Sequence, residues 1–200
     1  MNEKDGKTQY EKGLSPIASV SGCPLVVSDT EAGNHWYVMR ATYNREVKAK
    51  KMLEADGVVC YVPMKRMRTE CGDKMVPAVH NLLFVYTNRN FMDKWKRRHE
   101  EGCPLRYAMD RATSSPMIVR DKEMEDFILV TRNSNEEIIY LDNPNVAVEK
   151  GKQIEIVCGQ YAGVRGSVLR ILRDRKVVVS VNGLVSVALN GIPFSWMKEV

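Results

Sequence analysis

The chain has 200 residues, a length that fits one or two domains. Hydrophobic residues make up 44% of it and charged residues 28%, which is close to the average of folded proteins and excludes wholesale disorder. No run approaches the roughly 18 to 20 apolar residues that span a bilayer, and the N-terminal stretch lacks the apolar core of a signal peptide. The net charge of +5 is compatible with an anionic partner. We therefore expect a folded cytoplasmic protein that does not bind a membrane.

The five cysteines and three histidines show no spacing that is typical of a metal site. The cysteines are odd in number, widely separated and without a CxxC pair, so neither a disulfide framework nor a zinc ribbon is indicated. We expect buried free thiols, no metal and no cofactor. The nucleophile and phosphate-loop motifs of common enzymes are also missing from the sequence, which predicts a protein that is not an enzyme.

The first half of the chain predicts alternating strands and helices. Residues 1–34 show little periodicity and are expected to form a flexible tail. A strand follows from His35, and then a helix over 45–56 with Asn44 as its N-cap. Residues 81–87 are almost entirely apolar, which indicates a central strand that is covered on both faces. The other predicted elements are strands at 58–63 and 105–109, two extended arms over 66–81 that join near 71–73, a helix that begins at an Asn90 cap and a helix over 120–130.

The second half of the chain has a different pattern. Residues 142–147 contain the Asp-Asn-Pro-Asn break and predict a linker. Short β-type runs follow, and Asn182-Gly183 between two of them is a strong hairpin signal. The sequence therefore predicts the α+β class, with an α/β domain over 35–141, in which helices pack on a small sheet, and a small all-β barrel domain over 148–200.

The stretch KGKQIEIVCGQYAGVRGSV at 150–168 resembles a KOW motif. Gly159, Gly163 and Gly166 would allow a tight loop with backbone conformations that other residues avoid, and Tyr161 would pack over the end of the barrel. The resemblance implies that the C-terminal domain is an SH3-like KOW barrel.

Three segments of the first half resemble the N-terminal domain of NusG-type transcription elongation factors: His35–Val38, Gly57–Met64 and Asn81–Val85. The order of a NusG domain followed by a KOW domain matches over residues 35–200. The stretch Val59–Met64 looks closer to specialised paralogues typified by RfaH, and the segment from Val181 to Trp196 is similar to the UpxY-type antiterminators of Bacteroides-like bacteria. The resemblance implies a factor that rides on elongating RNA polymerase and suppresses pausing or termination, in a surface (capsular) polysaccharide operon. Through the polymerase it would be associated with the nucleoid.

The resemblance also implies a docking surface for RNA polymerase. In the family, a hydrophobic depression on the N-terminal domain receives a coiled-coil projection of the polymerase clamp. The matching positions here are Val38, Val79, Leu82 and Phe84. Plain core packing of these apolar residues is the alternative.

Specialised relatives contact the non-template DNA strand through basic residues near the first helix. The resemblance therefore implies that non-template DNA or nascent RNA binds at Arg40, Tyr43, Arg45 and Lys48. Cationic side chains attract phosphates irrespective of sequence, and Tyr43 could stack on a splayed base. A solvated amphipathic helix is the alternative.

Two other functions stay open at this point. A housekeeping NusG protein would act genome-wide and couple to Rho or the ribosome through its KOW domain. A general RNA-binding or ribosome-associated KOW protein would lose its partners after nuclease treatment. The sequence also leaves open a trans-acting inhibitor, the nucleic-acid element that is recognised, a change of fold in the KOW domain and the oligomeric state.

Overall fold

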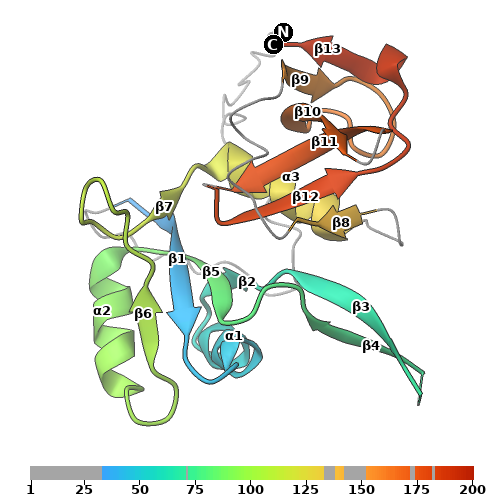
Figure 1. The fold of residues 1–200 in the computed structure, drawn as a ribbon. Coiled ribbons are helices and arrows are strands. Elements are labelled where there is room, and N and C mark those ends of the chain that lie inside the picture. Colours follow the sequence, from blue (N-terminus) through green and yellow to red (C-terminus); the bar gives the residue numbers. More distant parts are fainter. Residues whose placement is uncertain (1–32, 71, 133–137, 142–151, 172–173, 182) are drawn as a thin grey trace, which may run out of the picture.

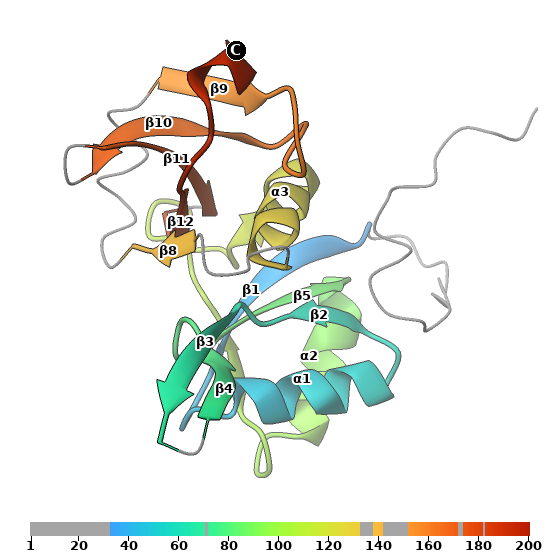
Figure 2. The same cartoon turned by 90° about the vertical axis from the view of Figure 1, so that its right-hand side faces the viewer.

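The computed structural model of this chain describes residues 33–70, 72–132, 138–141, 152–171, 174–181 and 183–200. In these ranges the chain forms a mixed structure of antiparallel sheets with helices packed between and beneath them (Figures 1 and 2). The predicted linker at 142–147 lies outside the described residues, as do residues 1–32 of the predicted tail and Asn182 of the predicted hairpin.

The first sheet has the strand order β2-β5-β1-β6, with β7 paired to β1, and neighbouring strands are antiparallel. In it, β5 lies between β2 and β1, and residues 82–85 are buried. The expected central strand, covered on both faces, is therefore confirmed. The strands of this sheet are β1 (His35–Ala41), β2 (Val59–Tyr61), β5 (Leu82–Thr87), β6 (Leu105–Tyr107) and β7 (Ile118–Val119).

Two helices cover one face of this sheet, as Figure 2 shows. They are α1 (Glu46–Ala55) and α2 (Arg89–Arg98). Apolar residues at helical spacing, such as Ala49 and Leu53 of α1, are fully buried and form one core cluster with the odd-numbered residues of β1 and β5. The strands alternate their side chains, so the even-numbered residues of β1 and β5 point to the opposite face.

Both predicted helix caps were wrong by one or two residues. Asn44 has a left-handed backbone, with φ 52°, and Arg45 takes the N-cap position of α1 without a side-chain cap bond. The backbone N–H of Asn44 instead donates to Oδ1 of Asn81, at 2.8 Å. In α2 the cap is Asn88, whose Oδ1 accepts the backbone N–H of Phe91 at 2.8 Å, so Asn90 lies inside the first turn. Several asparagines near a helix start compete for the cap, and tertiary pairing decides between them.

The third helix, α3 (Asp121–Arg132), covers the other face of the first sheet. Its apolar side chains at 124, 127 and 128 are buried, as the sequence predicts. Phe127 makes edge-to-face ring contacts with Phe84, at a centroid distance of 6.0 Å, and with Tyr61, at 6.3 Å. This helix therefore closes the face that α1 and α2 leave open.

A second, six-stranded antiparallel sheet packs on the far side of α3 (Figures 1 and 2). Its strand order is β13-β9-β10-β11-β12-β8. Val177 and Val179 of β11 share a continuous core cluster with Phe127 of α3 and with the first sheet. The strands are β8 (Ile138–Tyr140), β9 (Lys152–Ile156), β10 (Arg165–Ile171), β11 (Asp174–Val181), β12 (Val185–Leu189) and β13 (Met197–Glu199).

A two-stranded hairpin extends away from the body of the molecule (Figure 1). It consists of β3 (Met64–Thr69) and β4 (Gly72–Pro77), which confirms the two predicted extended arms. Most of its side chains are exposed.

The expected burial of the cysteine thiols holds only in part. Cys60 and Cys103 are buried and Cys158 is exposed, and all three are free. Cys158 lies two residues after the end of β9, at the start of the glycine-rich loop. Among the described residues, no helix combines the length and the apolar character needed to cross a membrane.

Candidate functional site

The four residues matched to a polymerase-docking surface lie on the α3 side of the first sheet. Val38 of β1 pairs directly with Phe84 of β5, and Leu82 lies two residues before Phe84 on the same face. All three have no exposed surface, because they belong to the core that α3 completes. Val79, in the turn before β5, is only partly buried. A partner could touch Val79 directly but could reach the other three only if the packing around them opened.

A hydrogen bond adds to the packing of α3 on this face. The Tyr61 hydroxyl and Oγ1 of Thr131 are hydrogen-bonded, and the same Thr131 hydroxyl donates to the backbone carbonyl of Phe127 at 2.6 Å. Burial raises the pKa of Tyr61 above its usual value. The Tyr61 hydroxyl therefore stays protonated at neutral pH and links β2 to the last turn of α3.

The basic residues predicted to bind nucleic acid separate into two groups. Arg40 is exposed on β1 and shares the α3 face with Val38. Arg45 and Lys48 belong to the opposite side, where α1 begins. Their side chains meet at one acceptor, since Nη1 of Arg45 and Nζ of Lys48 donate to the carbonyl of Gly102 at 3.2 and 3.1 Å.

Tyr43 lies between these two groups, in the turn that joins β1 to α1. It is 81% exposed and has φ 58°, a left-handed conformation that a tyrosine rarely adopts. The turn is fixed by Asn81, whose backbone carbonyl accepts the N–H of Ala41 at 3.1 Å and whose side chain accepts the N–H of Asn44. The guanidinium of Arg45 lies 5.5 Å from the centroid of the Tyr43 ring. The structure thus presents an aromatic ring and two cations at the rim of the sheet.

Arg106 of β6 is a further exposed cation that the sequence did not indicate. It pairs directly with Arg40 across the β1–β6 ladder. The sequence could not show that Arg106 lies next to Arg40, because the two residues become neighbours only through the pairing of strands that lie more than 60 positions apart.

The glycine-rich segment of the C-terminal sheet has the tight geometry that its composition predicts. Gly159 and Gly163 have φ of +83° and +87°. A Cβ on Gly166 would lie 2.7 Å from the carbonyl oxygen of Val178, so only glycine fits against β11 at this position. Tyr161 is 3% exposed and belongs to the core. These residues shape the loop, and its assignment as a KOW loop stays a prediction.

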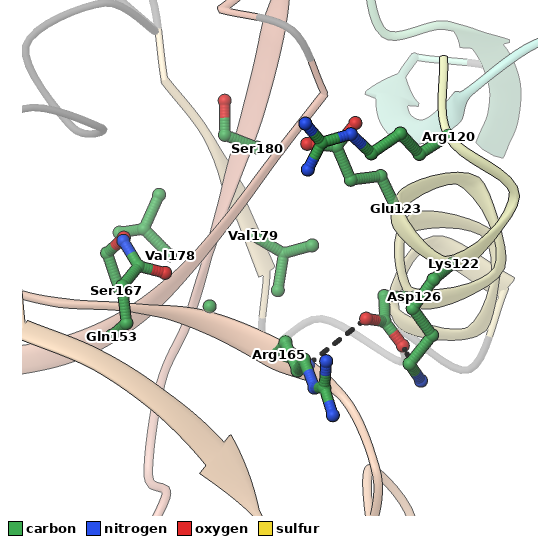
Figure 3. A pocket seen from close by; sticks show the side chains of 11 residues that line it. Arg120, Lys122, Glu123, Asp126, Gln153, Arg165, Ser167, Val178, Val179 and Ser180 are labelled. Carbon is green, nitrogen blue, oxygen red and sulfur yellow. Dashed lines mark hydrogen bonds and ion pairs between the residues drawn. The ribbon is translucent and has the colours of Figure 1, made fainter. Parts of the chain in front are cut away.

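A pocket of about 440 Å³ lies between α3 and the C-terminal sheet (Figure 3). Asp126 of α3, which is 4% exposed, accepts a hydrogen bond from Nζ of Lys122 at 2.8 Å and one from the backbone N–H of Arg165 at 3.2 Å. Lys122 also donates to the carbonyl of Gly163, at 2.9 Å. These polar contacts join the helix to β10 and to the glycine-rich loop.

Residues 34–128 match the NusG family model, described as transcription termination factor nusG. The matched segment runs from the residue before β1 into α3, so it contains the first sheet, the hairpin and the turn that carries Tyr43. A search of curated proteins found no match to the chain. Members of this family are transcription factors rather than enzymes and generally bind RNA polymerase. The match therefore supports a NusG-like factor, and its domain suggests a role in transcription elongation or antitermination.

Proposed function

We propose that this chain is a specialised antitermination and elongation factor that binds RNA polymerase and reduces pausing or termination in a surface (capsular) polysaccharide operon. The observation that carries the proposal is the turn at the end of β1, inside the matched segment, where Tyr43 is exposed beside Arg45. The specialisation itself rests on the resemblance of Val59–Met64 and of the segment 181–196 to specialised members of the family.

Contact with a single nucleic acid strand fits the chemistry of this turn. Stacking of a base on an exposed aromatic ring contributes about 1 to 3 kcal/mol and tolerates any base. Tyr43 can offer this ring without rearrangement, since its backbone is already held by Asn81. Arg45 and Lys48 each donate one hydrogen bond to the Gly102 carbonyl, and their other guanidinium and ammonium hydrogens can bind phosphates. Non-template DNA in the elongation complex, or the nascent RNA, would supply such a strand.

Polymerase docking on the α3 face has a structural requirement. Val38, Leu82 and Phe84 contribute to a clamp-binding surface only after α3 and the sheet behind it shift, because these three side chains have no exposed surface. Val79 is the member of the predicted set that a clamp helix could contact first. Binding of polymerase should therefore speed hydrogen exchange in α3, because the helix would lose part of its packing.

The experiment that tests the proposal measures antitermination in a reconstituted transcription reaction with a terminator downstream of the operon leader. We expect wild-type protein to raise read-through and Tyr43→Ala to lower it. The double substitution Arg45→Glu and Lys48→Glu should lower it further, because it removes two cations and introduces two anions. Lys51→Glu is the matched control, since Lys51 is also exposed on α1. If wild-type protein left read-through unchanged at every terminator tested, the proposed function would be wrong.

Locus-specific action needs a separate experiment. We expect chromatin occupancy of the protein to be confined to polysaccharide operons, near their leaders. Occupancy that followed polymerase over all transcribed genes would support a housekeeping NusG protein instead. Loss of polymerase retention after nuclease treatment would support the general RNA-binding protein.

A further inference from the structure

Two exposed arginines lie directly opposite each other on neighbouring strands. In the antiparallel ladder between β1 and β6, Arg40 pairs with Arg106. The side chains of such a pair leave the same face of the sheet, with their Cβ atoms about 4.5 to 5.5 Å apart. Both arginines are exposed.

This pair is unfavourable for the isolated protein. Like charges directly opposite each other on two strands destabilise a sheet. In the described part of the chain, neither Arg40 nor Arg106 forms an ion pair or a side-chain hydrogen bond. Two other strand arginines are balanced by acids: Arg68 lies opposite Asp73 in the hairpin, and Arg165 forms an ion pair with Glu155 across β9 and β10, at 3.0 Å. Arg175 lies opposite Arg170 in the β10–β11 ladder, but its guanidinium lies 5.9 Å from the centroid of the Phe194 ring. An external anion would offset the repulsion between Arg40 and Arg106.

We propose that Arg40 and Arg106 together bind one phosphate group of a single-stranded nucleic acid backbone. The proposal rests on the proposed function and adds a second contact area to it. A phosphodiester offers two non-bridging oxygens that share one negative charge, so each guanidinium can bind one oxygen, and arginine is well suited to such planar, paired hydrogen bonds.

The position of the arginine pair fits a nucleic acid strand that passes around the rim of the first sheet. Arg40 lies three residues before Tyr43, and Arg106 lies four residues after Gly102, the residue whose carbonyl holds Arg45 and Lys48. The paired arginines occupy the α3 face of the sheet, the two other cations occupy the side of α1, and the exposed Tyr43 ring lies at the turn between them. A nucleic acid strand with a base stacked on Tyr43 would thus bring one neighbouring phosphate to the arginine pair and another to Arg45 and Lys48.

The test measures binding of the full-length protein to a labelled single-stranded oligonucleotide by fluorescence anisotropy, over a series of salt concentrations. Arg106→Glu should weaken binding by roughly 10-fold to 100-fold, because it removes a charge-assisted hydrogen bond and adds repulsion. The slope of log K against log salt should become shallower by about 0.7, the value for one phosphate contact with a single strand. Arg106→Lys should keep most of the affinity.

Thermal stability separates this binding role from a structural one. Arg106→Glu places a carboxylate opposite Arg40, so the melting temperature should stay equal or rise while nucleic acid binding falls. Arg97→Glu, which changes an exposed arginine on α2, is the matched control and should keep full affinity. DNA and RNA strands of the same sequence, measured in parallel, tell which backbone supplies the phosphate.

Several outcomes would overturn the proposal. If Arg106→Glu kept the wild-type affinity and salt slope while Tyr43→Ala lost binding, the arginine pair would not be a phosphate site, although the proposed function would stand. If Arg106→Glu lost polymerase binding but not oligonucleotide binding, the pair would face an acidic protein surface. If the wild-type protein bound neither DNA nor RNA strands, the phosphate site and the nucleic-acid part of the proposed function would both fail.

Discussion

Replacement of Phe127 by alanine should destabilise both sheets together. The Phe127 ring is fully buried and touches Phe84 and Tyr61 of the first sheet, while the helix that carries it packs on β11 of the C-terminal sheet. A buried Phe→Ala change costs about 3 to 5 kcal/mol of the free energy of unfolding, and edge-to-face ring pairs place this site near the upper end. For a chain of this size, the melting temperature should fall by roughly 8 to 20 °C.

The assay is urea and thermal denaturation, followed by circular dichroism and by the fluorescence of single-tryptophan variants. Trp36 reports on the first sheet and Trp196 on the C-terminal sheet. We expect the two reporters to shift together in Phe127→Ala. The control is Phe194→Ala, whose ring is 72% exposed and should cost less than about 1 kcal/mol. A fall in stability seen by Trp36 but not by Trp196 would refute the inference that α3 is shared by one continuous core.

The remaining predictions concern single positions. Gly166→Ala should destabilise the C-terminal sheet by about 1 to 3 kcal/mol in the same denaturation assay, because the added Cβ would lie 2.7 Å from the Val178 carbonyl oxygen. The control, Gly102→Ala, should be near neutral, because there is open space around Gly102. Asp126→Ala should cost about 1 to 3 kcal/mol of unfolding free energy, since the backbone N–H of Arg165 loses its buried acceptor; an unchanged urea midpoint would contradict this. Burial, with a smaller contribution from Glu54, raises the pKa of the Cys60 thiol from 9.0 to about 12. The unfolded chain therefore releases the thiol proton at a lower pH than the folded chain, and the free energy of unfolding should fall as pH rises from about 9 towards 12. Measuring the free energy of unfolding of wild type and Cys60→Ala over this pH range tests whether the thiol causes the fall. Thiol labelling followed by peptide mass mapping should modify Cys158 while Cys60 and Cys103 stay protected, and early labelling of Cys60 would show that β2 is less well packed than described.

Much of the fold could be predicted from the sequence because local patterns were strong. The apolar run at 82–87, the helical spacing of Met124, Phe127 and Ile128 and the β-type runs of the second half all lie in the elements that they predict. The failures arose where several residues compete for one role. Asn44 and Asn90 are both residue types that often cap helices. Asn44 instead bonds to Asn81 before α1, and Asn88, two residues before Asn90, caps α2.

The candidate site depended more on tertiary structure than on local pattern. The apolar run at 82–87 predicts that both faces of the strand are covered, but it does not show that α3 is the element that covers Val38, Leu82 and Phe84. The sequence also could not separate Arg40 from Lys48, because the turn between Ala41 and Glu46 takes the chain to the other side of the sheet. Strand β8 (Ile138–Tyr140) was not predicted at all: it has only three residues and gains its stability from pairing with β12.

The proposed function requires that this NusG-like chain bind RNA polymerase, and we propose that it does so through the α3 side of its first sheet. The most direct measurement is a titration of the labelled full-length protein against core polymerase, with Val79→Asp as the test variant and Ile139→Asp as the matched control. Ile139 is a 40% exposed apolar residue of the C-terminal sheet, and both variants should keep the wild-type circular dichroism spectrum. We predict saturable binding for wild type and Ile139→Asp and a clear loss for Val79→Asp. Absence of saturable binding by the wild-type protein would contradict the claim, and equal binding by all three proteins would contradict the assigned surface.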